Sequence, residues 1–186
     1  MSDFVSRAGI KLDHALNTFG LDVSGLTCAD LGSNAGGFVD CLLQRGASKV
    51  YAIDTGYGAL DWKLRKDTCV VVMERTNAMH VQLPEVMAFV SIDVAWTKQR
   101  HILPAARRLI EAGGDVVTLI KPHYEASASL LRGGVLQTDA IDTILQLVKT
   151  DIAEAGFEIR QMTQSPLKGA KGNVEFLAHL HPKKMP

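Results

Sequence analysis

Four charged residues spread along the chain stand where an ordinary surface charge would be unusual. Lys11 lies in the segment SRAGIKL, and Asp93 ends the apolar stretch AFVSID. Lys121 ends the apolar stretch VVTLIK, and Glu175 stands at the start of the last apolar run, NVEFLAHL. A neutral lysine amine held beside a hydroxyl can accept its proton, and neighbouring charges tune how readily it does so. The four residues are therefore candidates for a proton-transfer site, provided that the fold brings them together.

The segment CADLGSNAGGF predicts a turn beneath a nucleotide-type cofactor. Asp30 ends a strand-like run, and the turn after it contains Gly32, Gly36 and Gly37 before a helix begins. Glycine allows the backbone to approach a ligand closely and to adopt positive φ angles. Asp54 ends the next strand-like run, 22 residues after Gly32, where a carboxylate can accept both ribose hydroxyls of a nucleoside. The alternative for the three glycines is that they only permit close packing of the helix on the sheet.

The same turn distinguishes between two kinds of cofactor. Its spacing is not the GxGxxG of a dinucleotide site, which must grip a pyrophosphate. An acidic residue beside the turn instead suits the cationic amino-acid end of S-adenosylmethionine (SAM), which is the predicted cofactor. No metal site is predicted, because the histidines lack ligand spacing. The candidate SAM-binding residues are Asp30, Gly32, Ser33, Asn34, Gly36, Gly37, Phe38, Asp54, Thr55, Asn77 and Asp93. A turn-capping role for Asn77 and a core position for Phe38 stay open as alternatives.

Apolar runs alternate with amphipathic stretches, which is typical of a doubly wound α/β fold. Helices are predicted over 9–19, 37–44, 59–66, 99–112 and 139–155. Strands are predicted over 26–31, 49–54, 69–74, 87–93, 115–121, 157–163 and 174–180. The last two strands have no helix between them, which predicts an antiparallel hairpin at the sheet edge. The long connection over 122–138 is predicted to be mobile.

These elements should gather the chemical residues at one edge of the sheet. Ligands in open α/β sheets bind outside the carboxyl ends of the strands. Asp54, Asp93 and Lys121 each end a predicted parallel strand and should therefore share an edge with the glycine turn. Glu175 reaches the same edge if the last strand runs antiparallel, and Lys11 comes from the helix before the first strand.

Size and composition favour one globular α/β domain over residues 1–186. The chain is 47% hydrophobic and 22% charged, which is normal for such a domain. No apolar run approaches the roughly 20 residues that cross a bilayer, so we expect a cytoplasmic protein without membrane contact. The formal net charge is zero, which argues against a large RNA-binding surface but not against a local basic patch.

Six segments carry a resemblance that covers nearly the whole chain. They are FVSRAGIKL, DLGSNAGGF, AIDTGYGALDWKLR, ERTN, IKPHYE and SPLKGAKGNVEF. With them the chain resembles the FtsJ-like RNA 2′-O-ribose methyltransferases, and within these the TlyA branch, also called haemolysin A. The resemblance implies a class I SAM-dependent methyltransferase (Rossmann-like) fold, which fits the predicted mostly parallel seven-stranded sheet with its C-terminal antiparallel hairpin.

The resemblance also implies a reaction and a substrate. A Lys-Asp-Lys-Glu catalytic tetrad of the family matches Lys11, Asp93, Lys121 and Glu175, with the second lysine as the proton acceptor. Known substrates of the branch are cytidine ribose 2′-hydroxyls, so the expected partner is ribosomal RNA or a ribosomal subunit. Such proteins normally begin with a small RNA-binding domain, which we expect this chain to lack. The family also tends to have Ser-Phe where this chain reads Val94-Ala95-Trp96.

Arg7 and Lys171 are the predicted RNA contacts, because they flank tetrad residues in the sequence. Trp96 could stack on a base, although a position in the core or the pocket wall is the favoured alternative. Two other functions stay open at this point. The protein could methylate a small molecule or a protein with the same cofactor, or it could be a non-catalytic protein that binds RNA or the ribosome.

We predict that the protein binds S-adenosylhomocysteine more tightly than NAD, because the glycine turn and Asp54 suit a nucleoside with a cationic tail. Asp54→Ala should weaken S-adenosylhomocysteine binding by about 1–3 kcal/mol, the scale for leaving buried hydroxyls unpaired. Isothermal titration calorimetry with each ligand measures both effects. Tighter binding of NAD would overturn the cofactor assignment, and an unchanged affinity of the variant would remove Asp54 from the ribose site.

Overall fold

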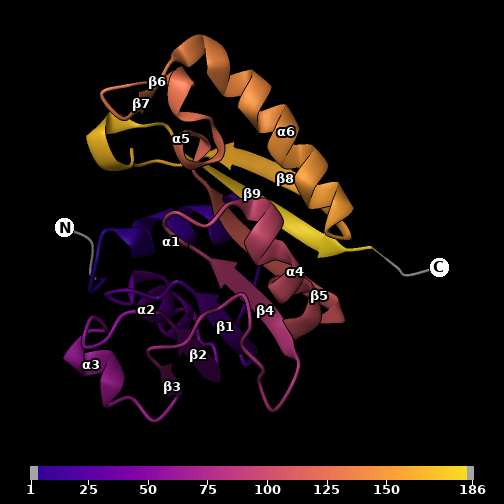
Figure 1. Cartoon of the computed structure of the whole chain (residues 1–186). Coiled ribbons are helices and arrows are strands. Elements are labelled where there is room, and N and C mark those ends of the chain that lie inside the picture. Colours follow the sequence, from indigo (N-terminus) through magenta and orange to yellow (C-terminus); the bar gives the residue numbers. More distant parts are fainter. Residues whose placement is uncertain (1–3, 184–186) are drawn as a thin grey trace.

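The computed structural model describes residues 4–183, so the first and last three residues of the predicted domain lie outside the described residues. Its strands form a seven-stranded sheet with helices on both faces (Figure 1). The strand order is β3-β2-β1-β4-β5-β9-β8. The strands are β1 (Thr27–Leu31), β2 (Lys49–Ile53), β3 (Val70–Met73), β4 (Met87–Ile92), β5 (Ile110–Ile120), β8 (Phe157–Gln164) and β9 (Phe176–Pro182). The first five are parallel, and β9 runs antiparallel between β5 and β8. The predicted fold class and its C-terminal antiparallel hairpin are confirmed.

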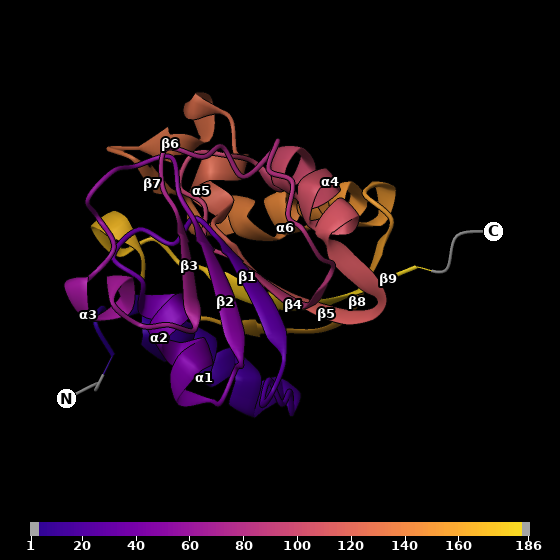
Figure 2. The ribbon, with the colours of Figure 1, turned by 90° about the horizontal axis from the view of Figure 1, so that it is seen from below.

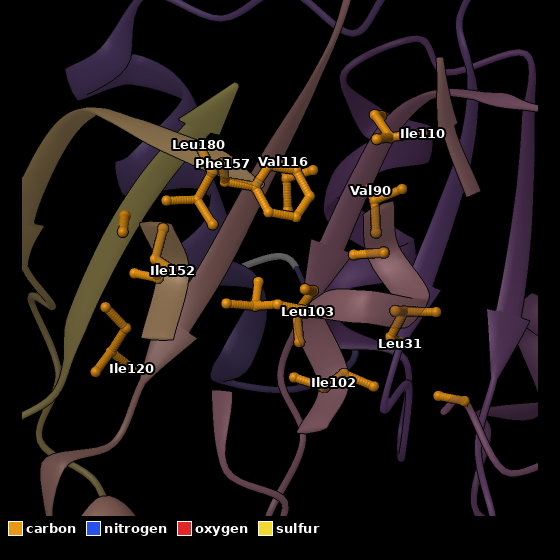
Figure 3. Packing of buried hydrophobic residues seen from close by; sticks show 14 of the residues in the cluster. Leu31, Val90, Ile102, Leu103, Ile110, Val116, Ile120, Ile152, Phe157 and Leu180 are labelled. Carbon is orange, nitrogen blue, oxygen red and sulfur yellow. The ribbon is translucent and has the colours of Figure 1, made fainter. Parts of the chain in front are cut away.

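Two layers of helices cover the sheet (Figure 2). The helices are α1 (Ala8–Phe19), α2 (Gly37–Gln44), α3 (Trp62–Arg65), α4 (Gln99–Leu109), α5 (Pro122–Glu125) and α6 (Ile141–Glu154). One core lies between the sheet and the pair α1 and α2, and the other lies between the sheet and the pair α4 and α6. Figure 3 shows the second core, where Leu103 of α4 and Ile152 of α6 pack near Phe157 of β8. Parallel strands covered on both sides are mostly apolar, which is why β1, β2 and β4 are rich in apolar residues and buried along most of their length.

The connection over 122–138 contains short regular elements, although we predicted only a mobile segment. It holds α5, the 3₁₀ turn Ala128–Leu130, and a small hairpin of β6 (Leu131–Arg132) and β7 (Val135–Leu136). The side chain of Asn173, distant in the sequence, secures the hairpin. Its Oδ1 accepts a hydrogen bond from Leu136 N at 3.0 Å, and its Nδ2 donates to Gly134 O at 3.0 Å. The sequence of the connection by itself gives no sign of these contacts.

Close packing of α1 against α2 requires glycine at position 37. A Cβ atom added there would lie 2.3 Å from Ser6 Oγ and 2.8 Å from Gly9 N. Real Cβ atoms do not approach other atoms that closely, so any larger residue would force the two helices apart. The packing role that we left open for the glycine turn therefore applies to Gly37.

Gly37→Ala should lower the free energy of unfolding by about 1–3 kcal/mol, the usual cost of forcing extra atoms into a packed interior. Alanine is otherwise the better helix former, so a loss of stability would report the steric conflict. Gly113→Ala is the matched control, because a Cβ at Gly113 meets nothing within 4 Å. Urea unfolding of the parent and both variants makes the comparison. Equal stability of the Gly37 variant and the parent would contradict the close packing.

Candidate active site

A cavity of about 570 Å³ opens at the carboxyl ends of the parallel strands. Its wall is formed mainly by the segments that follow β1, β2, β3 and β4, together with Lys121 after β5. Every predicted SAM-binding residue lines it except Gly36 and Gly37. Gly36, with φ 95°, would place a Cβ 2.2 Å from Leu64 Cδ1, so it packs against the protein rather than facing the cavity.

Asp30 contributes a buried carboxylate to the cavity wall. The residue is fully buried, and its Oδ1 accepts a hydrogen bond from Ser91 Oγ at 2.7 Å. Among the described residues its Oδ2 has no hydrogen-bond partner. Burial raises the pKa of Asp30 to about 7, a shift to which the charges of Asp93 and Asp54 contribute and which hydrogen bonds from serine side chains oppose. A buried carboxylate oxygen without a partner fits a cationic ligand group, such as the amino group of SAM.

Asp54 joins two loops of the cavity through backbone hydrogen bonds. Its Oδ2 accepts from Asn34 N at 2.8 Å, and its Oδ1 accepts from Gly56 N at 2.7 Å. An ionised carboxylate has about four acceptor positions, so each oxygen can still accept a ligand hydroxyl. The residue thus fits the ribose of a nucleoside cofactor while also fixing the glycine turn.

Asn77 and Phe38 each line the cavity and also have the structural role that the sequence left open as an alternative. Asn77 Oδ1 accepts a hydrogen bond from Met79 N at 3.0 Å, which caps the local turn, and Asn77 also lines the cavity. Phe38 is 2% exposed and belongs to the core beneath α2, yet it forms part of the cavity wall. Each residue therefore has a structural role and a place at the ligand site.

The order of the strands explains the positions of three of the four charged residues. Asp93 comes after β4, Lys121 after β5 and Glu175 before β9, and these three strands are adjacent in the sheet. Ile120 pairs with Phe176, so Lys121 and Glu175 stand directly beyond the last antiparallel pair. The antiparallel direction of β9 thus brings its first residues to the edge where the parallel strands end.

The four charges form two ion pairs that differ in their access to the cavity. Lys121 Nζ lies 2.6 Å from Asp93 Oδ1 and donates a hydrogen bond to Val94 O at 3.0 Å. Lys11 Nζ donates to Glu175 Oε2 at 2.5 Å. Asp93 and Lys121 line the cavity, whereas Lys11 and Glu175 are 7% and 3% exposed and do not line it. The Lys121–Asp93 pair therefore presents a potential proton acceptor to a ligand, and the second pair lies behind the wall.

His123 is a buried neutral group between the two pairs. It is 6% exposed and is not among the cavity residues. Burial lowers its pKa, the charge of Glu175 opposes this effect, and the charges of Lys121 and Lys11 add to it. Its Nδ1 has no hydrogen-bond partner in the described part of the chain. The imidazole therefore adds no charge to the site at neutral pH.

The two predicted RNA contacts are engaged with the protein backbone. Arg7 lines the cavity, and its Nη2 donates to the Lys168 carbonyl. Lys171 Nζ donates to Gly133 O at 2.8 Å, which ties its loop to the β6–β7 hairpin. To bind an RNA phosphate, either side chain must first give up its hydrogen bond to a backbone carbonyl.

Exposed aromatic rings stand near the same edge. Trp96 is 83% exposed and lines the cavity, so its position in the pocket wall is confirmed and a position in the core is excluded. Tyr57 and Trp62 are 72% and 67% exposed, and a basic side chain covers each ring: Arg75 over Tyr57 and Lys66 over Trp62. Sequence reasoning did not single out Tyr57 or Trp62. The available signal was the position of aromatic residues beside glycines and basic residues after a strand.

Fold and site together define the class of protein as a class I SAM-dependent methyltransferase. A nucleoside-sized cavity lies at the carboxyl ends of parallel strands, between a glycine turn and acidic strand ends. The family model for FtsJ-like methyltransferases matches residues 4–181, and the chain belongs to this family. The family indicated by the sequence is confirmed, and with it SAM as the cofactor.

Relatives and solved structures agree with this assignment. The chain is 41% identical over 188 residues to the protein YqxC of Bacillus subtilis, an alignment that covers 96% of this chain and 66% of that protein. It is 38% identical over 183 residues to the Mycobacterium tuberculosis protein named 16S/23S rRNA (cytidine-2′-O)-methyltransferase TlyA, covering 95% of this chain and 68% of the relative. A hemolysin-like protein from Streptococcus thermophilus superposes with a TM-score of 0.96 at 38% identity, covering 100% of this chain and 70% of that one.

A more distant likeness concerns the fold alone. A protein of the SAM-dependent methyltransferase type from Listeria monocytogenes superposes with a TM-score of 0.70 at 16% identity, over 96% of this chain and 100% of that one. No helix within residues 4–183 is long and apolar enough to cross a bilayer.

Asp30→Asn should stabilise the cofactor-free protein at alkaline pH and weaken SAM binding. The folded-state pKa of about 7 lies above the usual value of 3.8, so the folded state binds more protons than the unfolded state between these pH values. The stability of the parent should therefore fall by up to about 4 kcal/mol as pH rises from below 3.8 to 8, whereas the variant should not show this loss.

Urea unfolding at several pH values measures this effect, and calorimetry measures SAM affinity. Asp139→Asn is the matched control, because Asp139 is exposed. Parallel stability curves for the Asp30 variant and the parent would show that the Asp30 carboxyl titrates normally.

Proposed function

We propose that the protein transfers the methyl group of SAM to the 2′-hydroxyl of a ribose in ribosomal RNA. The observation that carries this proposal is the Lys121–Asp93 ion pair in the wall of the SAM-sized cavity. A lysine at that position can act on a hydroxyl that is held beside the cofactor. The named activity of the Mycobacterium tuberculosis relative supports the choice of substrate.

The cofactor would be held by the residues of the cavity wall. Asp30 would bind the cationic amino-acid end, and Asp54 would accept the ribose hydroxyls. Asn77 would face the adenine, with Phe38 as part of the apolar wall. The remaining proposed contacts are Gly32, Ser33, Asn34, Thr55 and Asp93. When bound, SAM supplies an electrophilic methyl group on a sulfonium sulfur.

Lys121 would serve as the general base. In its neutral amine form, Nζ would accept the proton of the 2′-hydroxyl, which converts a weak nucleophile into an oxygen able to attack. Asp93 Oδ1 and the Val94 carbonyl lie 2.6 and 3.0 Å from that Nζ and would hold it in place. Lys11 and Glu175 would complete the tetrad from behind the cavity wall, where their mutual neutralisation keeps the local charge balanced.

The surface around the cavity suits a single-stranded stretch of RNA. Sequence-specific RNA recognition uses unstacked bases that stack on aromatic side chains. Trp96 offers an exposed ring in the cavity wall, and Tyr57 and Trp62 are exposed in the segment between β2 and β3. Arg7 and Lys171 would contact phosphates after leaving their backbone carbonyls. Such an RNA would be bound as part of a ribosomal subunit, and a cytoplasmic location belongs to the same proposal.

The test is single-turnover methyl transfer to ribosomal subunits that lack the modification, followed by mapping of the labelled nucleotide. Lys121→Met and Lys121→Arg should each slow the transfer by about 10²–10⁴-fold, because neither side chain accepts a proton at neutral pH. SAM affinity should change little, since a lysine does not attract a sulfonium cation. Lys149→Met, at an exposed position of α6, is the matched control.

Three outcomes would contradict the proposal. Transfer at about the parent rate in either Lys121 variant would exclude Lys121 as the base. A large loss of SAM affinity would move Lys121 into the cofactor site. Label found only in protein or in small molecules, with total RNA tested in parallel, would replace the RNA substrate.

A further inference from the structure

Glu125, the last residue of α5, joins the turn that carries Lys121 to the start of α4. Its Oε1 accepts a hydrogen bond from Gln99 N at 2.9 Å. Its backbone carbonyl accepts one from Lys98 Nζ at 2.7 Å. Gln99 is the first residue of α4, and Lys98, at the N-cap position, gives the helix no side-chain cap of its own. Glu125 therefore satisfies a helix amide that has no partner within the helix.

The end of β5 is bound to the same junction. Gln99 is 2% exposed, and its Oε1 accepts a hydrogen bond from Thr118 Oγ1 at 2.9 Å. On the other side of the ion pair, Lys121 Nζ donates to Val94 O at 3.0 Å. The segment 93–98, which contains Asp93, is thus held near its beginning by Lys121 and at its end by Glu125. These contacts fix the two segments that carry the Lys121–Asp93 pair relative to each other.

Burial disfavours the ionised form of Glu125. Burial raises the pKa of Glu125, even though the hydrogen bond from Gln99 and the charge of Lys98 oppose this effect. A carboxyl group with a raised folded-state pKa makes the folded state bind protons more readily, so stability falls as pH rises above its usual pKa. Ionisation of Glu125 therefore costs folding stability, and the contact that remains to be explained is its hydrogen bond from Gln99 N.

We propose that Glu125 is a positioning residue for methyl transfer, which holds the 121–125 turn against α4 so that Lys121 and Asp93 keep their geometry at the cavity. This inference rests on the proposed role of Lys121. Glu125 itself does not line the cavity, so it would act through the turn and not by touching the substrate. The expected effect is on rate, because displacements of about 1 Å at a reacting group can cost as much as 10²-fold.

Two variants separate positioning from simple stabilisation. Glu125→Ala removes the acceptor and should slow single-turnover transfer by about 10–100-fold, with SAM affinity and the RNA KM within about twofold of the parent. Glu125→Gln keeps the length and one acceptor oxygen, so it should restore most of the rate. Rates are measured well below the melting temperature of each variant, where a purely stabilising residue would leave them unchanged.

A second measurement needs neither RNA nor cofactor. The rate at which acetic anhydride acetylates Lys121, followed by peptide mass spectrometry, reports on the environment of its amine. Glu125→Ala should change this rate by at least about threefold if the ion pair is displaced, whereas exposed Lys149 should react as in the parent. Should Glu125→Ala fail to fold, Lys98→Met removes the other bond to the same residue and takes its place.

The two measurements distinguish failure of this inference from failure of the proposed function. Unchanged transfer and unchanged Lys121 acetylation in Glu125→Ala would overturn the positioning role. A parent that modifies no RNA, combined with altered Lys121 acetylation in the variant, would leave the positioning role standing and reject the RNA substrate. A loss of stability without either change would make Glu125 a structural residue only.

Discussion

The antiparallel pairing of β9 with β5 is the interaction on which the site depends. In a sheet of parallel strands, only residues that follow the strands reach the ligand edge. Because β9 runs the opposite way, the residue before it reaches that edge too, and Glu175 comes to stand beside Lys121. The contact of Glu175 with Lys11 then joins residues 164 positions apart in the sequence. One strand direction thus fixes α1, Lys121 and β9 in a single arrangement.

Around this arrangement the protein keeps ionisable groups where burial penalises them. Burial raises the pKa of both Asp30 and Glu125, so ionising either group costs folding stability. The Lys11–Glu175 pair is almost wholly buried, where desolvation offsets much of the attraction between the charges. Two continuous apolar cores on either side of the sheet supply the stability that tolerates these groups. Departures from an apolar interior are expected at functional sites, and here they gather at one edge of the sheet.

The segment between β4 and α4 contacts both the cavity and Lys121. Asp93 and Trp96 belong to the cavity wall, while the Val94 carbonyl accepts a hydrogen bond from Lys121. One short stretch of backbone therefore contributes to the cavity wall and also holds Lys121, the proposed base. Its position is set by contacts with the turn after β5, which is the reason for looking beyond the four charged residues to Glu125.

The sequence by itself determined the order of the seven strands along the chain and of the main helices, the strand-end positions of Asp54, Asp93 and Lys121, and the family. Doubly covered parallel strands read as continuous apolar runs, and glycine turns are local signals, so both are visible without a structure. Only the tertiary structure decided which charges pair, which pair faces the cavity, and that Gly37 serves helix packing while Trp96 is exposed. Those properties depend on register and on contacts between segments far apart in the chain, which no local pattern specifies.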